Sequence, residues 1–346
     1  MRWVWIGVAL AACSAKPAES EPAKSAPAAA PIEATPAVAP AREPDRASGF
    51  VPPDDKTRFA AVGNLAMLPE HLQLAFSSEE FSPMAAVESG DWLAEHPEPG
   101  QTYDQFVAAR YQRPTAERRT IYVLQIGALD RRRASALPVL IEFLEAYFQL
   151  PVKVMRPVEA DDLGARSRPR ATGEQLHAGD ILSALEQRLP NDAFCLIALT
   201  VTDLYPQDDW QFVFGMARLR TRVGVYSFAR YHPGFYGAEY AHNRYDTLIL
   251  DRSLKIMAHE VGHMFGLEHC IYYECVVNGS NSMGETDRRP SHLCPVDLRK
   301  LHHSIRFDPK ARYEQLERFY RRRGLAGHAA WVRSRRIAIE GVSQMR

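Results

Sequence analysis

A chain of 346 residues, 46% of them hydrophobic, is long enough to bury one large core or two smaller ones. Its formal net charge of zero gives no reason to expect nucleic acid or an anionic surface as the main partner. Composition therefore argues against a nucleic-acid-binding protein, and the function has to be inferred from local motifs.

The first thirteen residues, MRWVWIGVALAAC, place one basic residue before an apolar run that ends at Cys13. The run is too short to span a bilayer, and it fits the apolar core of an export signal with small residues before the cleavage site. The ending LAAC also resembles the lipobox of bacterial lipoproteins, in which the cysteine becomes the lipidated first residue. The alternative is an unprocessed apolar start with an incidental cysteine. We predict lipidation at Cys13 and an exported, membrane-anchored lipoprotein of the cell envelope.

The next segment has the composition of a linker. Residues 14–48 contain 12 Ala and 7 Pro in 35 positions and no aromatic residue. Such a segment cannot bury a core, so we expect a disordered, semi-rigid tether that holds a folded domain off the membrane surface. Residues 49–114 mix apolar positions with several prolines, and we expect a poorly defined N-terminal region there.

From residue 120 onwards, apolar β-rich runs alternate with helical patterns, which predicts an α/β fold with a mostly parallel sheet. Pro138 suits the first turn of a helix expected at 137–150. Cys195 lies inside a strand and is expected to be a small buried hydrophobe. We expect strands at 120–129, 152–158, 193–201, 210–217 and 222–231, helices at 137–150, 172–189 and 246–267, and a loop at 231–246.

The stretch HEVGHMFGLEHC, residues 259–270, has the spacing of a metal site. His259 and His263 are four apart, so a helix places both imidazoles on one face, where both can bind one ion. Glu260 lies beside that ion, where a base can take a proton from a metal-bound water. Gly266 can end the helix sharply and let the chain turn back, so that His269 supplies a third ligand. Three protein ligands leave a fourth position open, as in a catalytic zinc site.

The full pattern HExxHxxGxxH is much more specific than HExxH alone, because the glycine and the third histidine each meet a separate geometric need. The competing interpretation is a non-catalytic zinc that holds helix and loop together. A purely structural site would more often be closed by a fourth protein ligand, and it would not need Glu260.

A second group of ligands follows directly. Cys270, Cys275 and Cys294 lie within 25 residues and could bind a structural zinc through three thiolates. The fourth ligand is Asp297, three residues after Cys294, with His292 as the alternative. The competing interpretation is that no second metal binds and the thiols are free or partly oxidised.

These motifs resemble those of the archaemetzincins, a branch of the metzincin clan of zinc metallopeptidases. The resemblance is most specific from about residue 192 to 303, and weaker similarity extends over 115–330. It is carried by HEVGHMFGLEHC with Cys275, by NGSNS (278–282), DRRP (287–290), LCP (293–295) and LRKL (298–301), and upstream by LTVTDLYPQDDWQFVFGMA (199–217) and VGVYSFARY (223–231).

The resemblance implies that His259, His263 and His269 bind catalytic zinc and that Glu260 is the general base. It also implies a second zinc on four cysteines, three of which are matched here while Asp297 replaces the fourth. Val277 stands where the family has a methionine beneath the histidines, and Met283 is a nearby candidate to replace it. The implied fold is metzincin-like: a twisted, mostly parallel sheet, a backing helix, an active-site helix and an irregular C-terminal subdomain.

The sequence thus predicts a zinc-dependent peptidase whose catalytic domain spans 115–330, followed by a tail at 331–346. The alternative is a non-catalytic, membrane-tethered zinc-binding module. We expect one catalytic and one structural Zn²⁺, a peptide or protein substrate, a monomer, no nucleic-acid partner, and membrane contact only through the lipid anchor.

Overall fold

The computed structural model describes residues 49–129, 131–237 and 242–340. Cys13, the predicted signal and the predicted tether at 14–48 lie outside the described residues. Within the described ranges, no helix combines the length and the apolar character needed to cross a bilayer.

The centre of the fold is a five-stranded sheet of β1 (Thr120–Ile126), β2 (Val152–Val154), β5 (Ala193–Thr200), β7 (Gly215–Arg218) and β8 (Val223–Ser227). The strand order is β2-β1-β5-β8-β7, and only β7, at one edge, runs antiparallel to its neighbour. β5 has the apolar sequence AFCLIALT and is buried along its whole length, as expected for a strand between two parallel neighbours. The predicted α/β fold with a mostly parallel sheet is confirmed.

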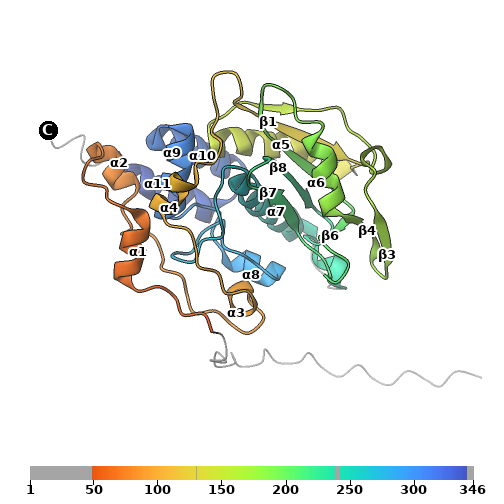
Figure 1. Cartoon of the computed structure of the whole chain (residues 1–346), viewed down its shortest axis with the longest axis horizontal. Coiled ribbons are helices and arrows are strands. Elements are labelled where there is room, and N and C mark those ends of the chain that lie inside the picture. The colour runs from red at the N-terminus through yellow and green to blue at the C-terminus, as the bar shows by residue number, and fades with distance from the viewer. Residues whose placement is uncertain (1–48, 130, 238–241, 341–346) are drawn as a thin grey trace, which may run out of the picture. The chain divides into compact units, whose positions relative to one another are not determined.

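Helices cover both faces of this sheet: α5 (Arg131–Phe148) and α7 (His242–Met264) on one face, and α6 (Ala178–Glu186) on the other. The alternation of side chains along β5 explains the two layers. Cys195 and Ile197 belong to the core on the side of α5 and α7, whereas Leu196 and Ala198 pack on the side of α6. Figure 1 shows these layers, with α7 next to the edge strand β7.

The first two predicted helices begin at the wrong residue. Helix α5 begins at Arg131, so Pro138 lies inside the helix and not in its first turn. Residues 131–133 are all arginine and show no apolar periodicity, so the sequence did not indicate that the helix begins there. The predicted helix at 172–189 begins instead as a strand.

A second, three-stranded sheet accounts for that strand. It consists of β3 (Ser167–Arg170), β4 (Gly173–His177) and β6 (Asp203–Tyr205), in the order β3-β4-β6. The buried Gln175 side chain donates to Asp203 Oδ2 at 2.6 Å, which ties β4 to β6. His177 then caps α6 by accepting a bond from the Asp180 backbone N–H.

Residues 49–114 are ordered, which corrects the expectation of a poorly defined region. They contain four short helices, α1 (Asp55–Val62), α2 (Glu70–Ala75), α3 (Trp92–Glu95) and α4 (Tyr103–Ala109). Buried arginines of the C-terminal part bind their helix ends: Arg299 donates to the Val62 carbonyl at 2.5 Å, and Arg335 donates to the Leu74 carbonyl at 3.0 Å. These contacts join segments more than 230 residues apart.

The C-terminal part comprises an irregular segment after α7 and four helices: α8 (Met283–Arg288), α9 (Pro295–Ile305), α10 (Pro309–Arg322) and α11 (Ala326–Glu340). Helix α11 covers most of the expected tail at 331–346. Val332 and Ile339 are buried, so apolar packing keeps this segment on the domain. Figure 1 shows α9, α10 and α11 beside α1, α2 and α4.

The loop expected at 231–246 contains a short 3₁₀ helix, Pro233–Tyr236, and α7 starts at His242. The strand expected at 210–217 is shorter than predicted, because regular pairing with β8 begins only at Gly215. Val213 forms an isolated antiparallel bridge with Leu204 instead.

Candidate metal centre

Helix α7 presents His259 and His263 on one face, with their Nε2 atoms 2.9 Å apart. After the helix ends, Gly266 adopts the left-handed region at φ +87°. A Cβ there would lie 2.3 Å from Tyr111 Cγ, so both the conformation and the space require glycine. The turn brings His269 back, and one ring nitrogen of each histidine lies within 4.8 Å of the other two.

Backbone carbonyls orient the two helical rings. His259 Nδ1 lies 3.0 Å from the Val276 oxygen, and His263 Nδ1 lies 2.5 Å from the Leu267 oxygen. Because a carbonyl can only accept, Nδ1 carries the proton in each ring. The Nε2 lone pairs are therefore left for an ion.

The charge state of the rings also suits a cation. Burial, followed by repulsion from the other two rings, holds the pKa of His259 well below its ordinary value. Burial likewise lowers the pKa of His263 to about 4. Neutral imidazoles that converge on one point fit the donor set of a zinc site.

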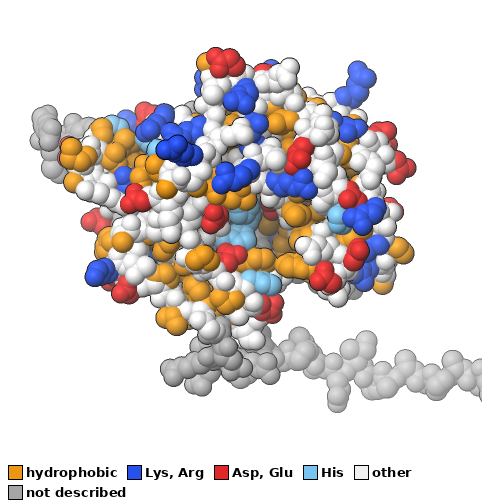
Figure 2. Space-filling model, in the orientation of Figure 1, with side chains coloured by type: hydrophobic (Ala, Val, Ile, Leu, Met, Phe, Trp, Pro, Cys, Tyr) orange, Lys and Arg blue, Asp and Glu red, His pale blue; other side chains and the backbone are white. Residues whose placement is uncertain are grey.

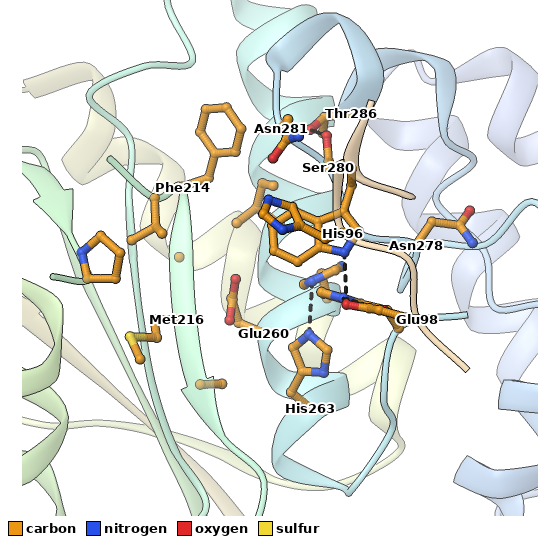
Figure 3. A pocket seen from close by; sticks show the side chains of 18 of the residues that line it. His96, Glu98, Phe214, Met216, Glu260, His263, Asn278, Ser280, Asn281 and Thr286 are labelled. Carbon is orange, nitrogen blue, oxygen red and sulfur yellow. Dashed lines mark hydrogen bonds and ion pairs between the residues drawn. The ribbon is translucent and has the colours of Figure 1, made fainter. Parts of the chain in front are cut away.

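Glu260 is buried beside the histidines, between α7 and the edge strand β7 (Figure 3). Burial raises the pKa of its carboxyl group to about 8. The space for this side chain depends on Gly215 in β7, where a Cβ would lie 2.4 Å from Glu260 Oε1. Glycine at position 215 therefore leaves the space that the Glu260 carboxyl group occupies.

A cavity of about 930 Å³ borders the three histidines and Glu260. Phe214, Gly215 and Met216 of the β7 segment line one wall, and residues 90–100 contribute to the lining as well. Figure 2 shows histidine side chains in a hollow near the middle of this face. The site is therefore open to a molecule as large as a peptide.

The second group of predicted ligands also converges. Cys270 Sγ lies 3.5 Å from Cys294 Sγ, and Asp297 Oδ2 lies 3.4 Å from Cys275 Sγ and 3.1 Å from Cys294 Sγ. All four side chains are buried, the three cysteines form no disulfide, and the four donor atoms lie within 4.8 Å of one another. Three sulfurs and one oxygen fit a closed tetrahedral zinc site.

Asp297 has a buried partner that was not predicted from the sequence. Lys300 Nζ lies 2.9 Å from Asp297 Oδ1, and both side chains are almost completely buried. Burial raises the pKa of Asp297 to about 6, although the charge of Lys300 opposes this shift. His292, the alternative fourth ligand, lies outside the cluster, because its ring stacks on Trp331 with centroids 3.5 Å apart.

Val277 is fully buried against the helix that carries the histidines: its Cγ1 lies 3.1 Å from the position of a Cβ at Gly262. It therefore gives α7 an apolar contact on this side. Met283 begins α8 and is not among the described residues that line the cavity.

The Asn278 side chain organises the loop that carries Cys270 and Cys275. It accepts from the Cys275 N–H at 2.7 Å and donates to the carbonyls of Cys270 and Tyr273. A Cβ at Gly279 would lie 2.2 Å from Trp92, so the loop also packs tightly on the N-terminal region. These contacts tie the loop that carries Cys270 and Cys275 to Trp92 of the N-terminal region.

One residue of the histidine site, Glu98, was not predicted from the sequence. Glu98 Oε1 lies 2.9 Å from His269 Nδ1, and it also accepts from Trp92 Nε1 at 2.9 Å. Burial opposes ionisation of Glu98, but the hydrogen bond and charge of His269 outweigh it and lower its pKa. No spacing rule could find this contact, because 171 positions separate the two residues.

Three converging neutral imidazoles, with a carboxylate next to an open cavity, define a metal-dependent hydrolase. A family model described as Peptidase family M54 matches residues 140–303. The chain is 37% identical over 286 residues to archaemetzincin-2 of Macaca fascicularis, which covers 75% of this chain and 79% of that protein. The chain therefore belongs to the archaemetzincins, as predicted, and it is a metallopeptidase.

Two solved structures are also similar. An archaemetzincin from Methanopyrus kandleri is 26% identical with a TM-score of 0.43, covering 56% of this chain and 99% of that chain. A zinc-dependent peptidase from Methanocorpusculum labreanum is 25% identical with a TM-score of 0.44, covering 52% of this chain and 99% of that chain.

Proposed function

We propose that this chain is a zinc-dependent peptidase in which His259, His263 and His269 hold the catalytic zinc and Glu260 is the general base. The observation that carries the proposal is the convergence of the three rings beside a buried carboxylate that faces an open cavity. The M54 family match supports the same reaction.

Zinc, when bound, lowers the pKa of water to about 7 and polarises a carbonyl group. Burial alone raises the pKa of Glu260 to about 8, but a cation held by the three histidines would favour its ionised form. The carboxylate of Glu260 would then take a proton from the attacking water and later deliver it to the leaving amine. Its buried position between α7 and β7 keeps the carboxylate away from bulk solvent, so that the proton passes between the reacting groups.

The edge strand β7 supplies a surface for the substrate. It pairs with β8 on one side, and its residues Gly215, Met216 and Ala217 line the cavity. An extended peptide can add to such an edge through main-chain hydrogen bonds. The bond to be cleaved would then lie near Glu260, which contacts Gly215.

The test is cleavage of a mixed peptide pool by a soluble form, residues 49–346, and by its Glu260→Gln variant. We expect the variant to keep its zinc and to lose at least about 100-fold in rate, the contribution of a general base. Equal cleavage by both proteins would overturn the assignment of Glu260 as the base. No cleavage by either protein would overturn the peptidase proposal and favour a non-catalytic, membrane-tethered zinc-binding module.

We also propose a second, structural zinc on Cys270, Cys275, Cys294 and Asp297, supported by their convergence and burial. Native mass spectrometry should find two zinc ions per chain, and one in Cys275→Ser. One ion in the wild-type protein, held by the histidines, would reject the second site.

Finally, we propose that the protein is exported and anchored through lipidated Cys13. The apolar run before Cys13 and the Ala/Pro-rich segment after it support this location. Cys13→Ser should move the protein from the membrane fraction to the soluble fraction. Unchanged partitioning would refute lipidation.

A further inference from the structure

His269 differs from the other two histidines in how it is held. His259 and His263 lie on α7, and their Nδ1 atoms face backbone carbonyls. His269 lies in the loop after the helix, and its Nδ1 faces a side chain, the carboxylate of Glu98, at 2.9 and 3.1 Å from the two oxygens. The orientation of this ring therefore depends on a residue outside the metal-binding motif.

We propose that Glu98 is a positioning residue for the catalytic metal: it holds the His269 ring so that its Nε2 points at the ion. This inference rests on the proposed zinc site of the three histidines. It makes Glu98 part of the active site, although this residue precedes the segment matched by the family model, residues 140–303.

The chemistry of the pair supports this role. A carboxylate that accepts from Nδ1–H fixes the tautomer of the ring, fixes its rotation and makes Nε2 a stronger donor to a cation. An ion pair alone would not require the carboxylate to lie within hydrogen-bond distance of Nδ1. Both Glu98 and His269 line the cavity, so the contact lies at the site itself.

The carboxylate is itself held in place. Trp92 Nε1 donates to Glu98 Oε1 at 2.9 Å, and the Trp92 and His269 rings form a T-shaped pair, with centroids 5.1 Å apart and an interplanar angle of 78°. The Trp92 backbone N–H donates to the buried Glu285 of α8 at 3.1 Å. Prolines on both sides of Glu98, in the sequence HPEPG (96–100), restrict the backbone of the segment.

Glu95 offers a matched control. It lies in the same segment and lines the same cavity, but its carboxylate accepts from Asn281 Nδ2 at 3.0 Å and from no histidine among the described residues. If the acidic residues of this segment had only a structural role, substitutions of Glu95 and Glu98 would have the same effect on zinc affinity.

The experiment measures zinc affinity of the full chain by competition with a chromogenic chelator, for the wild type, Glu98→Gln, Glu98→Ala and Glu95→Gln. We expect Glu98→Ala to weaken the histidine site by on the order of 10–100-fold. Glu98→Gln should fall between it and the wild type, because an amide oxygen still accepts from Nδ1–H. Glu95→Gln should stay within about twofold of the wild type, as for substitutions away from the ligands.

The visible spectrum of the Co²⁺-loaded protein gives a second readout, since it reports ligand orientation and not stability. It should change in both Glu98 variants and stay unchanged in Glu95→Gln. Wild-type zinc affinity and an unchanged cobalt spectrum in folded Glu98→Ala would overturn the inference. Neither measurement uses a substrate, so a failure of the proposed function would show separately, as equal cleavage by the wild type and Glu260→Gln or as no cleavage by either.

Discussion

Gly215 controls the position of the proposed general base. A Cβ at this residue would lie 2.4 Å from Oε1 and 2.7 Å from Cδ of Glu260. Because these atoms belong to the end of a flexible side chain, Gly215→Ala should fold while the carboxylate moves away. We expect peptide cleavage to fall by about 100-fold, close to the loss of a general base, with zinc content unchanged.

Gly327→Ala is the matched control, because a Cβ at Gly327 in α11 would have no described atom within 4 Å beyond its chain neighbours and its own helix backbone. Its cleavage rate should equal that of the wild type. Full activity in Gly215→Ala would show that Glu260 tolerates the displacement, and it would contradict the assigned position of the base.

The contribution of Lys300 to stability can be tested by a single substitution. Its ammonium group is the buried partner of Asp297, so Lys300→Met should leave an unpaired carboxylate in the interior. Breaking such a pair costs about 3–5 kcal/mol, and we expect this loss in denaturant unfolding of the zinc-free protein. The double variant Lys300→Met/Asp297→Asn should recover part of it, since no buried charge remains. Additive losses would show that the two groups do not interact.

At the scale of elements, the sequence predicted a helix or strand correctly where the whole pattern lay within that one element. The histidines of α7 and the strands β1 and β5 were predicted because helical spacing and continuous apolar runs are local properties. β4 was predicted as helix because its strand character depends on pairing with β6, which lies 28 residues further along the chain. Tertiary contacts decided its conformation.

The same limit applies to the site. His259, Glu260, His263 and His269 follow a spacing rule, and so do the three cysteines. Glu98, Lys300 and Gly215 do not, because their roles come from contacts between elements. A single carboxylate in a proline-rich segment or a single glycine in a strand carries no motif, so only the fold identifies it.

Helix α9 contains a histidine that should make the packing of the N-terminal helices sensitive to pH. His302 lies between Phe76 and Phe307, with ring centroids 5.3 and 5.4 Å away. Burial, and then the nearby Arg306 and His71, lower its pKa to about 4. Between the unfolded pKa of about 6.5 and this folded value, the unfolded chain binds more protons, so stability falls as the pH falls through that window.

His302→Leu removes this titration. After allowing for the partial exposure of the ring, we expect the stability of the variant relative to the wild type to rise by about 1 kcal/mol from pH 7 to pH 5. Urea unfolding at the two pH values measures the difference. A constant difference between the two proteins would show that His302 is protonated equally in both states.

For the whole molecule, the N-terminal and C-terminal parts form one structural unit with the sheet. The Arg299 and Arg335 contacts to the ends of α1 and α2, and the Glu98 contact to His269, all cross the predicted domain boundary at 115. Residues 49–114 are therefore better described as part of the catalytic domain than as a region before it. Helix α11 likewise belongs to the same domain, because its Val332 and Ile339 are buried in the same hydrophobic core.

The two proposed metal sites differ in access, which should separate them during metal removal. The histidines border the cavity, whereas Cys275, Cys294 and Asp297 are completely buried. A strong chelator should therefore remove one zinc while near-UV circular dichroism stays native. The zinc of the buried site should leave only as the loop that carries Cys275 and helix α9 open, because its binding free energy contributes to folding.

The absorbance of a zinc-responsive dye, recorded with the dichroism, should show a fast and a slow phase, and Cys275→Ser should show only the fast one. Release of both ions in one phase, with native dichroism throughout, would contradict a structural role for the buried site.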